Sequence, residues 1–137
     1  RSRPKGQCGF KIVHTMTRGL PGSITLKEDS REPIRSPTRE LLQKMLEVNQ
    51  ITDFDTIGAM IFTLTDDLRA AFPAEAARQL GMQMVPLINS REIPVPGALP
   101  RVIRVMMLWN TNLPQKQVKH VYLREAVRLR PDLESAQ

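Results

Sequence analysis

A permanent positive charge lies inside an apolar segment, at Arg104 within residues 103–108 (Ile-Arg-Val-Met-Met-Leu). The segment predicts a β-strand, in which side chains alternate between two faces, so that Arg104 stands out from one face. The opposite face is wholly apolar: Ile103, Val105 and Met107. Because a guanidinium does not lose its proton to escape burial, it needs a partner. Two interpretations follow: an edge strand whose arginine reaches water or a neighbouring carboxylate, and a pocket for a small carboxylate or phosphate.

Length and charge limit the classes of function. The chain has 137 residues, which suits one domain with a modest core, and no stretch approaches the length of a transmembrane helix. The 20 basic and 14 acidic residues leave a charge of +6, which favours an anionic partner: a nucleic acid, an acidic membrane surface or a polyanionic metabolite. One Trp, one Tyr and four Phe are few for stacking bases, which disfavours the nucleic acid. We therefore expect neither a nucleic-acid nor a membrane partner.

Metal and cofactor chemistry have no signal in the sequence. Cys8 is the single cysteine, which excludes an internal disulfide or a thiolate cluster and suits a reducing cytoplasm. His14 and His120 lie too far apart in the sequence to suggest a metal site. The motifs G-x-S-x-G, the Walker loop, G-x-G-x-x-G and H-E-x-x-H are all missing from the sequence. We expect no metal and no cofactor, and a reaction that needs only electrostatic stabilisation and orientation.

The N-terminal half predicts a tail, a strand and one long helix. Residues 1–9 are basic and aperiodic, so we expect a flexible tail, and residues 10–16 alternate as a first strand. Residues 18–22 hold two glycines and a proline, which predicts a loop. Since proline inside a helix costs about 3 kcal/mol, we expect the helix to begin at Ser36 with Pro37 as its first helical residue. The helix should end near residue 49, and its apolar stripe at helical spacing consists of Leu41, Leu42, Met45 and Leu46.

The C-terminal half supplies further strands around residues 103–108. The expected elements are a strand at 56–64 in the centre of the sheet, a short helix at 72–81, an edge strand at 84–88, a loop at 89–97 and a strand at 119–123. Four or five strands with two helices predict an α+β fold, with helices packed on one face of a mixed β-sheet. We expect a single domain over residues 10–133 and a short tail at 134–137.

Six short segments occur in an order and at a spacing that together are highly specific. They are residues 72–74 with Arg78 downstream, 85–87, 91–93, 103–107, 120–123 and 129–133. Through them the chain from about residue 18 to 133 resembles the AroH-class chorismate mutases, monofunctional bacterial enzymes that isomerise chorismate to prephenate in phenylalanine and tyrosine biosynthesis. The resemblance implies a cytoplasmic homotrimer with a pseudo-α/β-barrel fold. It also implies that active sites lie at subunit interfaces and bind the small molecule chorismate.

The resemblance also implies roles for individual residues. The reaction is pericyclic and needs no acid, base, metal or covalent intermediate, so the site must hold the dianion and stabilise charge on its ether oxygen. Arg104 would meet that oxygen and a carboxylate, Glu92 would accept a hydrogen bond from the substrate hydroxyl, and Tyr122 would hold a carboxylate. The expected binding residues around them are Phe72, Ala74, Arg78, Leu87, Ile88, Asn89, Leu129 and Arg130.

Each of these residues also has a purely structural interpretation. Phe72 and Leu129 are core types, and Tyr122 could cap a strand edge. Glu92 beside Arg91 would ordinarily form a surface ion pair worth under about 1 kcal/mol. Arg78 and Arg130 could likewise be solvated charges on the surface.

The sequence departs from the family pattern near its start. The family carries Arg-Gly-x-Arg-Gly, whose second arginine grips a substrate carboxylate, and Pro21 stands in that place here. Arg18 lies three residues earlier and would have to swing in to replace it. Glu75 stands where some relatives carry lysine, which would put a negative charge at the mouth of a site for a dianion. The alternative function is therefore a catalytically impaired trimeric relative that binds an anionic metabolite or serves a structural role.

Overall fold

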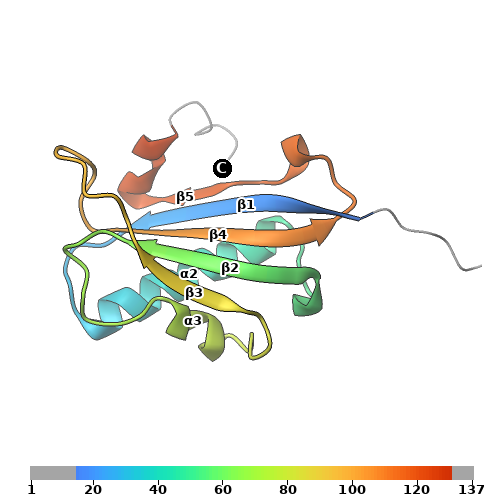
Figure 1. The fold of residues 1–137 in the computed structure, drawn as a ribbon, viewed down its shortest axis with the longest axis horizontal. Helices are drawn as coiled ribbons and strands as arrows, with labels where there is room; N and C mark the ends of the chain where they lie inside the picture. The colour runs from blue at the N-terminus through green and yellow to red at the C-terminus, as the bar shows by residue number, and fades with distance from the viewer. Residues whose placement is uncertain (1–14, 131–137) are drawn as a thin grey trace, which may run out of the picture.

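Five strands form one mixed sheet in the computed structural model, which describes residues 15–130. The strand order is β3-β2-β4-β1-β5, with antiparallel β1–β4 and β2–β4 pairs and parallel β1–β5 and β2–β3 pairs (Figure 1). The strands are β1 (Met16–Thr25), β2 (Ile57–Leu64), β3 (Leu87–Arg91), β4 (Val102–Thr111) and β5 (Val121–Leu123). The helices are α2 (Arg31–Val48) and α3 (Ala74–Gln79), with single 3-10 turns η1 (Phe54–Thr56), η2 (Gln115–Gln117) and the longer η3 (Arg124–Leu129).

Both α-helices cover the same face of the sheet, as Figure 1 shows. The expected α+β fold, with helices on one face of a mixed sheet, is confirmed. In the described chain, no helix combines the length and apolar character needed to cross a membrane. The expected tails, and all but the last two residues of the strand predicted at 10–16, lie outside the described residues.

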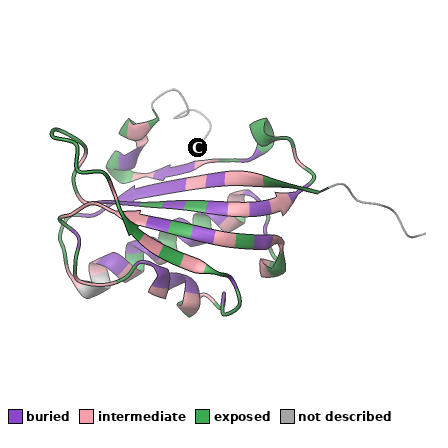
Figure 2. Cartoon of the chain, in the orientation of Figure 1, coloured by how far each residue is buried: buried purple, intermediate pink, exposed green. Residues whose placement is uncertain are grey.

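The core lies between α2 and the sheet. The predicted helix stripe is buried there, with Leu41, Leu42 and Met45 inaccessible to solvent. They pack in one cluster with the apolar side of β4, in which Ile103 and Met107 are also inaccessible. Buried and exposed residues alternate along the strands in Figure 2, as expected when one face meets the core and the other does not.

β4 holds Arg104 in the middle of the sheet. The strand pairs with β1 on one side and β2 on the other, so the interpretation as an edge strand is wrong. The predicted alternation is confirmed, because Ile103, Val105 and Met107 are buried while Arg104 and Met106 are exposed on the other face. We call the sheet face that carries Arg104, opposite the face that packs against α2, the open face.

β1 runs through residues 18–22, which were expected to form a loop. The amide of Gly19 donates to Gln115 Oε1 at 3.1 Å and its carbonyl accepts from Gln115 Nε2 at 2.7 Å, so both groups point away from β4. Strand backbones repeat every two residues, which makes the nitrogen of Pro21 face the same way. The missing N–H therefore costs no hydrogen bond to β4, and the strand continues through the proline.

α2 begins at Arg31, five residues before the expected start, and is unbroken. Pro33 lies in its first turn, where backbone N–H groups have no partner within the helix. Pro37 lies inside the helix and removes one backbone hydrogen bond. The prediction of a late or broken helix is wrong because Ile34 is fully buried in the core, and such packing outweighs the local preference against proline.

β3 begins at Leu87 rather than at residue 84. Pro86 stays outside the strand and contributes its carbonyl, which accepts from the Met60 amide at 2.9 Å. The residues after it pair with β2 as far as Arg91, so the first part of the loop expected at 89–97 is strand. The short helix expected at 72–81 is present as α3 and ends before Gly81, whose φ of +97° is a left-handed conformation.

Candidate active site

A row of side chains crosses the open face of the sheet. Tyr122 pairs with Ser23, Ser23 pairs with Arg104, and Arg104 pairs with Thr63 in the strand register. Register partners project to the same face, so these four residues from β5, β1, β4 and β2 form one line. The row is buried at Tyr122 and Ser23 and opens to solvent at Arg104, where 45% of the side chain is exposed.

Glu92 joins the row from the end of β3. Its amide donates to the carbonyl of Leu64 at 2.8 Å, which extends the β2–β3 pairing by one residue. Its Oε2 atom lies 3.9 Å from Nη1 of Arg104 and accepts a hydrogen bond of 2.6 Å from the hydroxyl of Thr63. The structural alternative for Glu92, an ordinary surface pair with Arg91, is wrong, because Arg91 forms its ion pair with Asp66.

These groups line a cavity of about 220 Å³ on the open face. Its lining residues are Pro21, Gly22, Ser23, Ile61, Thr63, Glu92, Arg104, Val105 and Met106. The cavity offers one guanidinium, one carboxylate, the hydroxyl groups of Ser23 and Thr63, and apolar side chains. This set suits an anion that carries a hydroxyl group, since a cation attracts negative charge and a carboxylate accepts from a hydroxyl.

Tyr122 stands two strands away from Arg104, about 10 Å along the row. Its hydroxyl lies 3.4 Å from Nδ1 of His120, and the side chain is buried. Ser23 separates the tyrosine from Arg104, and Tyr122 does not line the 220 Å³ cavity. The structure thus brings Arg104 and Glu92 together and places Tyr122 farther along the same line.

A second group of predicted residues gathers beside α3. Phe72 is 64% exposed and lines a cavity of about 460 Å³ with Asn89, whose Oδ1 accepts from the Ala74 amide at 3.2 Å. This cavity shares no lining residue with the one beside Arg104. Leu87 faces the core, whereas Ile88 projects from the open face with 62% of its surface exposed.

The remaining charged candidates have local partners. Nη1 of Arg78 donates to the Gln83 carbonyl at 2.7 Å, which ties the end of α3 to the following turn. Glu75 forms an ion pair of 2.6 Å with Arg35, so its negative charge is balanced within the chain.

Arg18 lies on the wrong face to replace the missing arginine. It pairs in register with Trp109 on the side of the sheet that faces α2, and its Nε donates to the Leu113 carbonyl at 2.9 Å. Pro21 is on the open face opposite Met106. Alternation along β1 therefore prevents Arg18 from reaching the cavity of Pro21 without breaking the strand.

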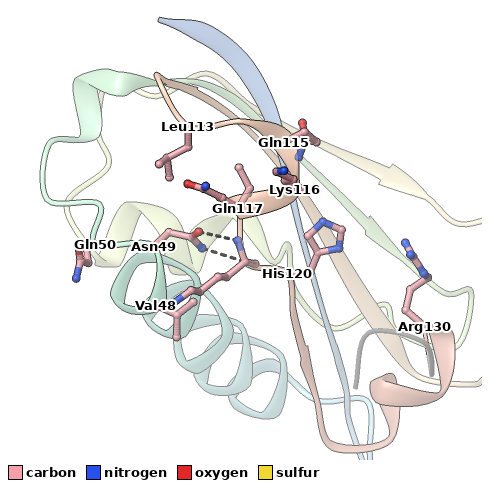
Figure 3. Close-up of a pocket in the computed structure, with 11 residues that line it drawn as sticks. Val48, Asn49, Gln50, Leu113, Gln115, Lys116, Gln117, His120 and Arg130 are labelled. Carbon is pink, nitrogen blue, oxygen red and sulfur yellow. Dashed lines mark hydrogen bonds between the residues drawn. The ribbon is translucent and has the colours of Figure 1, made fainter. Parts of the chain in front are cut away.

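A cavity of about 810 Å³ lies at the C-terminal end of α2, and Figure 3 shows the residues that line it. Asn49 ties the helix end to the following segment, since its side chain accepts from the Lys119 amide at 2.9 Å and donates to the Lys119 carbonyl at 3.0 Å. Lys116, Lys119 and Arg130 line the cavity, where positive charge complements the negative end of the helix dipole. This cavity shares no lining residue with the Arg104 cavity. Leu129 is the last residue of η3, directly before Arg130.

Sequence reasoning missed Thr63 and Ser23. Both are small hydroxyl residues inside strands, where threonine and serine are common and carry no chemical signature. Only the register places them beside Arg104, because it depends on which strands pair. In the sequence, the available signal was a polar residue, Thr63, in the otherwise apolar segment 57–64.

The fold and the site define a class of protein: a small α+β protein that presents an arginine and a carboxylate on the open face of a mixed sheet. The family model described as chorismate mutase type I matches residues 17–133, and the chain belongs to this family. The resemblance noted from the sequence is therefore confirmed.

Two curated relatives carry the name chorismate mutase AroH. The one from Thermus thermophilus is 66% identical over 122 residues, covering 89% of this chain and 100% of the relative. The one from Bacillus subtilis (strain 168) is 44% identical over 119 residues, covering 86% and 93%. A solved chorismate mutase from Clostridium thermocellum, Cth-682, superimposes with a TM-score of 0.76 at 44% identity, covering 79% of this chain and 96% of that chain. These likenesses support an isomerase of the chorismate mutase kind and lend no support to the alternative of a relative without catalysis.

Proposed function

We propose that this chain converts chorismate to prephenate as a homotrimer whose active sites each combine two subunits. The observation that carries the proposal is the Arg104–Glu92 pair, held 3.9 Å apart on the open face of the sheet in a member of the chorismate mutase type I family. A dianionic substrate with a ring hydroxyl matches a guanidinium beside a carboxylate acceptor.

The reaction breaks a carbon–oxygen bond and forms a carbon–carbon bond in one step, without proton transfer. Negative charge grows on the ether oxygen as its bond to carbon lengthens, and the guanidinium of Arg104 donates to that oxygen. Glu92 accepts from the ring hydroxyl and so fixes how the ring is turned. Loss of one preorganised donor of this kind typically costs about 2.7 to 4 kcal/mol of transition-state stabilisation. Tyr122, farther along the row, holds a carboxylate of the substrate.

Two features of the single chain support an active site shared between copies, as the proposed trimer requires. The open face exposes three apolar side chains in a line across β4, β2 and β3, with Met106 at 40%, Ile61 at 39% and Ile88 at 62%. The residues around Phe72 and Asn89 line a separate cavity from Arg104. A single chain therefore does not bring the Phe72 group and the Arg104 group into contact with the same ligand. A neighbouring copy that covers the open face would supply its Phe72 group to the Arg104 cavity, in a closed symmetric assembly.

The proposed cell compartment is the cytoplasm. A chain with one cysteine does not depend on an internal disulfide, which suits a reducing environment.

The direct test is the conversion of chorismate by the purified chain in a buffer with a metal chelator. We expect loss of chorismate absorbance together with appearance of prephenate by proton NMR. A chain that binds chorismate and leaves it unchanged would contradict the proposal.

The shared site is tested by mixing two inactive variants. Arg104→Ala removes the cation from one side, and Phe72→Asp puts a carboxylate against a dianion on the other. After unfolding and refolding a 1:1 mixture, random assembly leaves about a quarter of the sites with both natural halves, so about a quarter of the natural activity returns. If each site belongs to one chain, the mixture stays as inactive as its components.

A further inference from the structure

The carboxylate of Glu92 is held by two neighbours of different kinds. The hydroxyl of Thr63 donates to Oε2 at 2.6 Å, and Nη1 of Arg104 lies 3.9 Å from the same oxygen. A direct bond between guanidinium and carboxylate is about 2.7 to 2.9 Å long. Glu92 therefore stops about one ångström short of a hydrogen bond to the arginine, although the two charges attract each other.

Thr63 is fixed in the position that holds the carboxylate back. It lies inside β2, between Arg104 of β4 and Ser90 of β3 in the register, so its backbone is paired on both sides. Its branched side chain has few rotamers in a strand, which fixes the direction of the hydroxyl. A short hydrogen bond from a neutral hydroxyl to a carboxylate is strong enough to decide between two nearby carboxylate positions.

We propose that Thr63 is a positioning residue of the active site that keeps Glu92 and Arg104 apart in the free enzyme. This inference rests on the roles proposed above for these two residues. With Oε2 engaged by the hydroxyl, Oε1 of Glu92 stays available for the substrate hydroxyl, and the guanidinium stays available for the ether oxygen. Without Thr63, Glu92 closes onto Arg104, and the substrate has to break an ion pair before it can bind productively.

The test compares Thr63→Val with Thr63→Ser. Valine keeps the shape and removes the hydroxyl, and we expect kcat/KM for chorismate to fall on the order of ten- to a hundredfold, as a displacement of about 1 Å in a reacting site does. Serine keeps the hydroxyl and should stay within about threefold of the natural chain, since only one methyl group is lost. The matched control is Thr17→Val, because Thr17 is also a strand threonine that donates to a side chain, Oδ1 of Asn110 at 2.7 Å. The control should keep the natural rate.

A double-mutant comparison separates positioning from a general structural effect. Glutamine at position 92 cannot form an ion pair with Arg104, so Thr63→Val should lower kcat/KM by less than about twofold in a Glu92→Gln background. An equal loss in both backgrounds would overturn the inference, because a structural defect does not depend on the charge of residue 92. Rates for Thr63→Val within twofold of the natural chain would also overturn it.

The outcomes also distinguish this inference from the proposed function. If Arg104→Ala and Glu92→Gln both leave the rate unchanged, the proposed roles fail and the inference fails with them. If both variants are impaired while Thr63→Val is not, only the role of Thr63 is refuted.

Discussion

Arginine at position 21 should make the enzyme faster. Pro21 faces Met106 in the register and lies diagonally across from Arg104, about 7 to 8 Å away on the same face of the sheet. A guanidinium introduced there reaches the same cavity and adds a charge-assisted hydrogen bond to a substrate carboxylate, worth about 1.5 to 3 kcal/mol. We therefore expect Pro21→Arg to raise kcat/KM for chorismate by roughly ten- to a hundredfold.

The same substitution should cost stability in the absence of substrate. Two like charges about 8 Å apart repel by at most about 2 kcal/mol at an effective dielectric of about 20, and exposure of Arg104 reduces this. The free energy of unfolding of the free protein, measured with urea, should therefore fall by up to that amount.

Two controls separate the guanidinium from other effects of the change. Pro21→Gln restores a backbone N–H without charge and should leave kcat/KM within about threefold of the natural chain. Thr17→Arg adds the same charge to the same face of β1, about 13 Å from position 21. Its rate therefore measures how far an added positive charge alone speeds the arrival of an anionic substrate. A rise as large in Thr17→Arg, or no rise in Pro21→Arg, would refute the reasoning.

Two further predictions concern stability and ionisation. A Cβ added at Gly22 would overlap the Met45 sulfur and lie 3.1 Å from its Cγ, so Gly22→Ala should lower the free energy of unfolding by about 1 to 3 kcal/mol. In Gly58→Ala the new Cβ meets nothing closer than 3.7 Å, so an equal loss there would contradict the packing argument. The hydrogen bond from Arg91 holds the pKa of Asp66 below its ordinary value of 3.8. The ion pair stabilises the folded state at pH values above the pKa that Asp66 has in the unfolded chain, and this stabilisation is lost as pH falls through the pKa of the folded chain. Arg91→Gln should return the pKa of Asp66, measured by NMR, toward 3.8. An Asp66 titration that is the same in both chains would exclude this pairing in solution.

The strand that carries Arg104 could be predicted because its pattern has one physical cause. One face of β4 meets the core and the other does not, so apolar residues recur at every second position and leave Arg104 on the other face. The face of α2 that meets the sheet was visible for the same reason, in Leu41, Leu42 and Met45.

The errors arose where distant residues decide local structure. Residues 18–22 have the composition of a loop, yet the side chain of Gln115, remote in sequence, satisfies the backbone of Gly19. Pro37 should have ended a helix in isolation, but burial of Ile34 before it and of Leu41 and Leu42 after it holds the helix together.

The candidate site was predictable only in part. Arg104 followed from the pattern of its strand, whereas Glu92 and the roles of both residues followed from the family resemblance. The structure places the two side chains 3.9 Å apart. Thr63 and Ser23 could not be predicted, because their position beside Arg104 depends on the pairing of β2, β4 and β1, which no short stretch of sequence encodes.

The central claim is that the guanidinium of Arg104 stabilises charge that develops in the transition state. The most direct measurement is kcat for chorismate conversion by Arg104→Ala, Arg104→Lys and the exposed control Arg128→Ala, with folding verified by circular dichroism. The account predicts that kcat falls by at least about a hundredfold in Arg104→Ala, falls less in Arg104→Lys and is unchanged in Arg128→Ala. A fall of less than about tenfold in Arg104→Ala would contradict it.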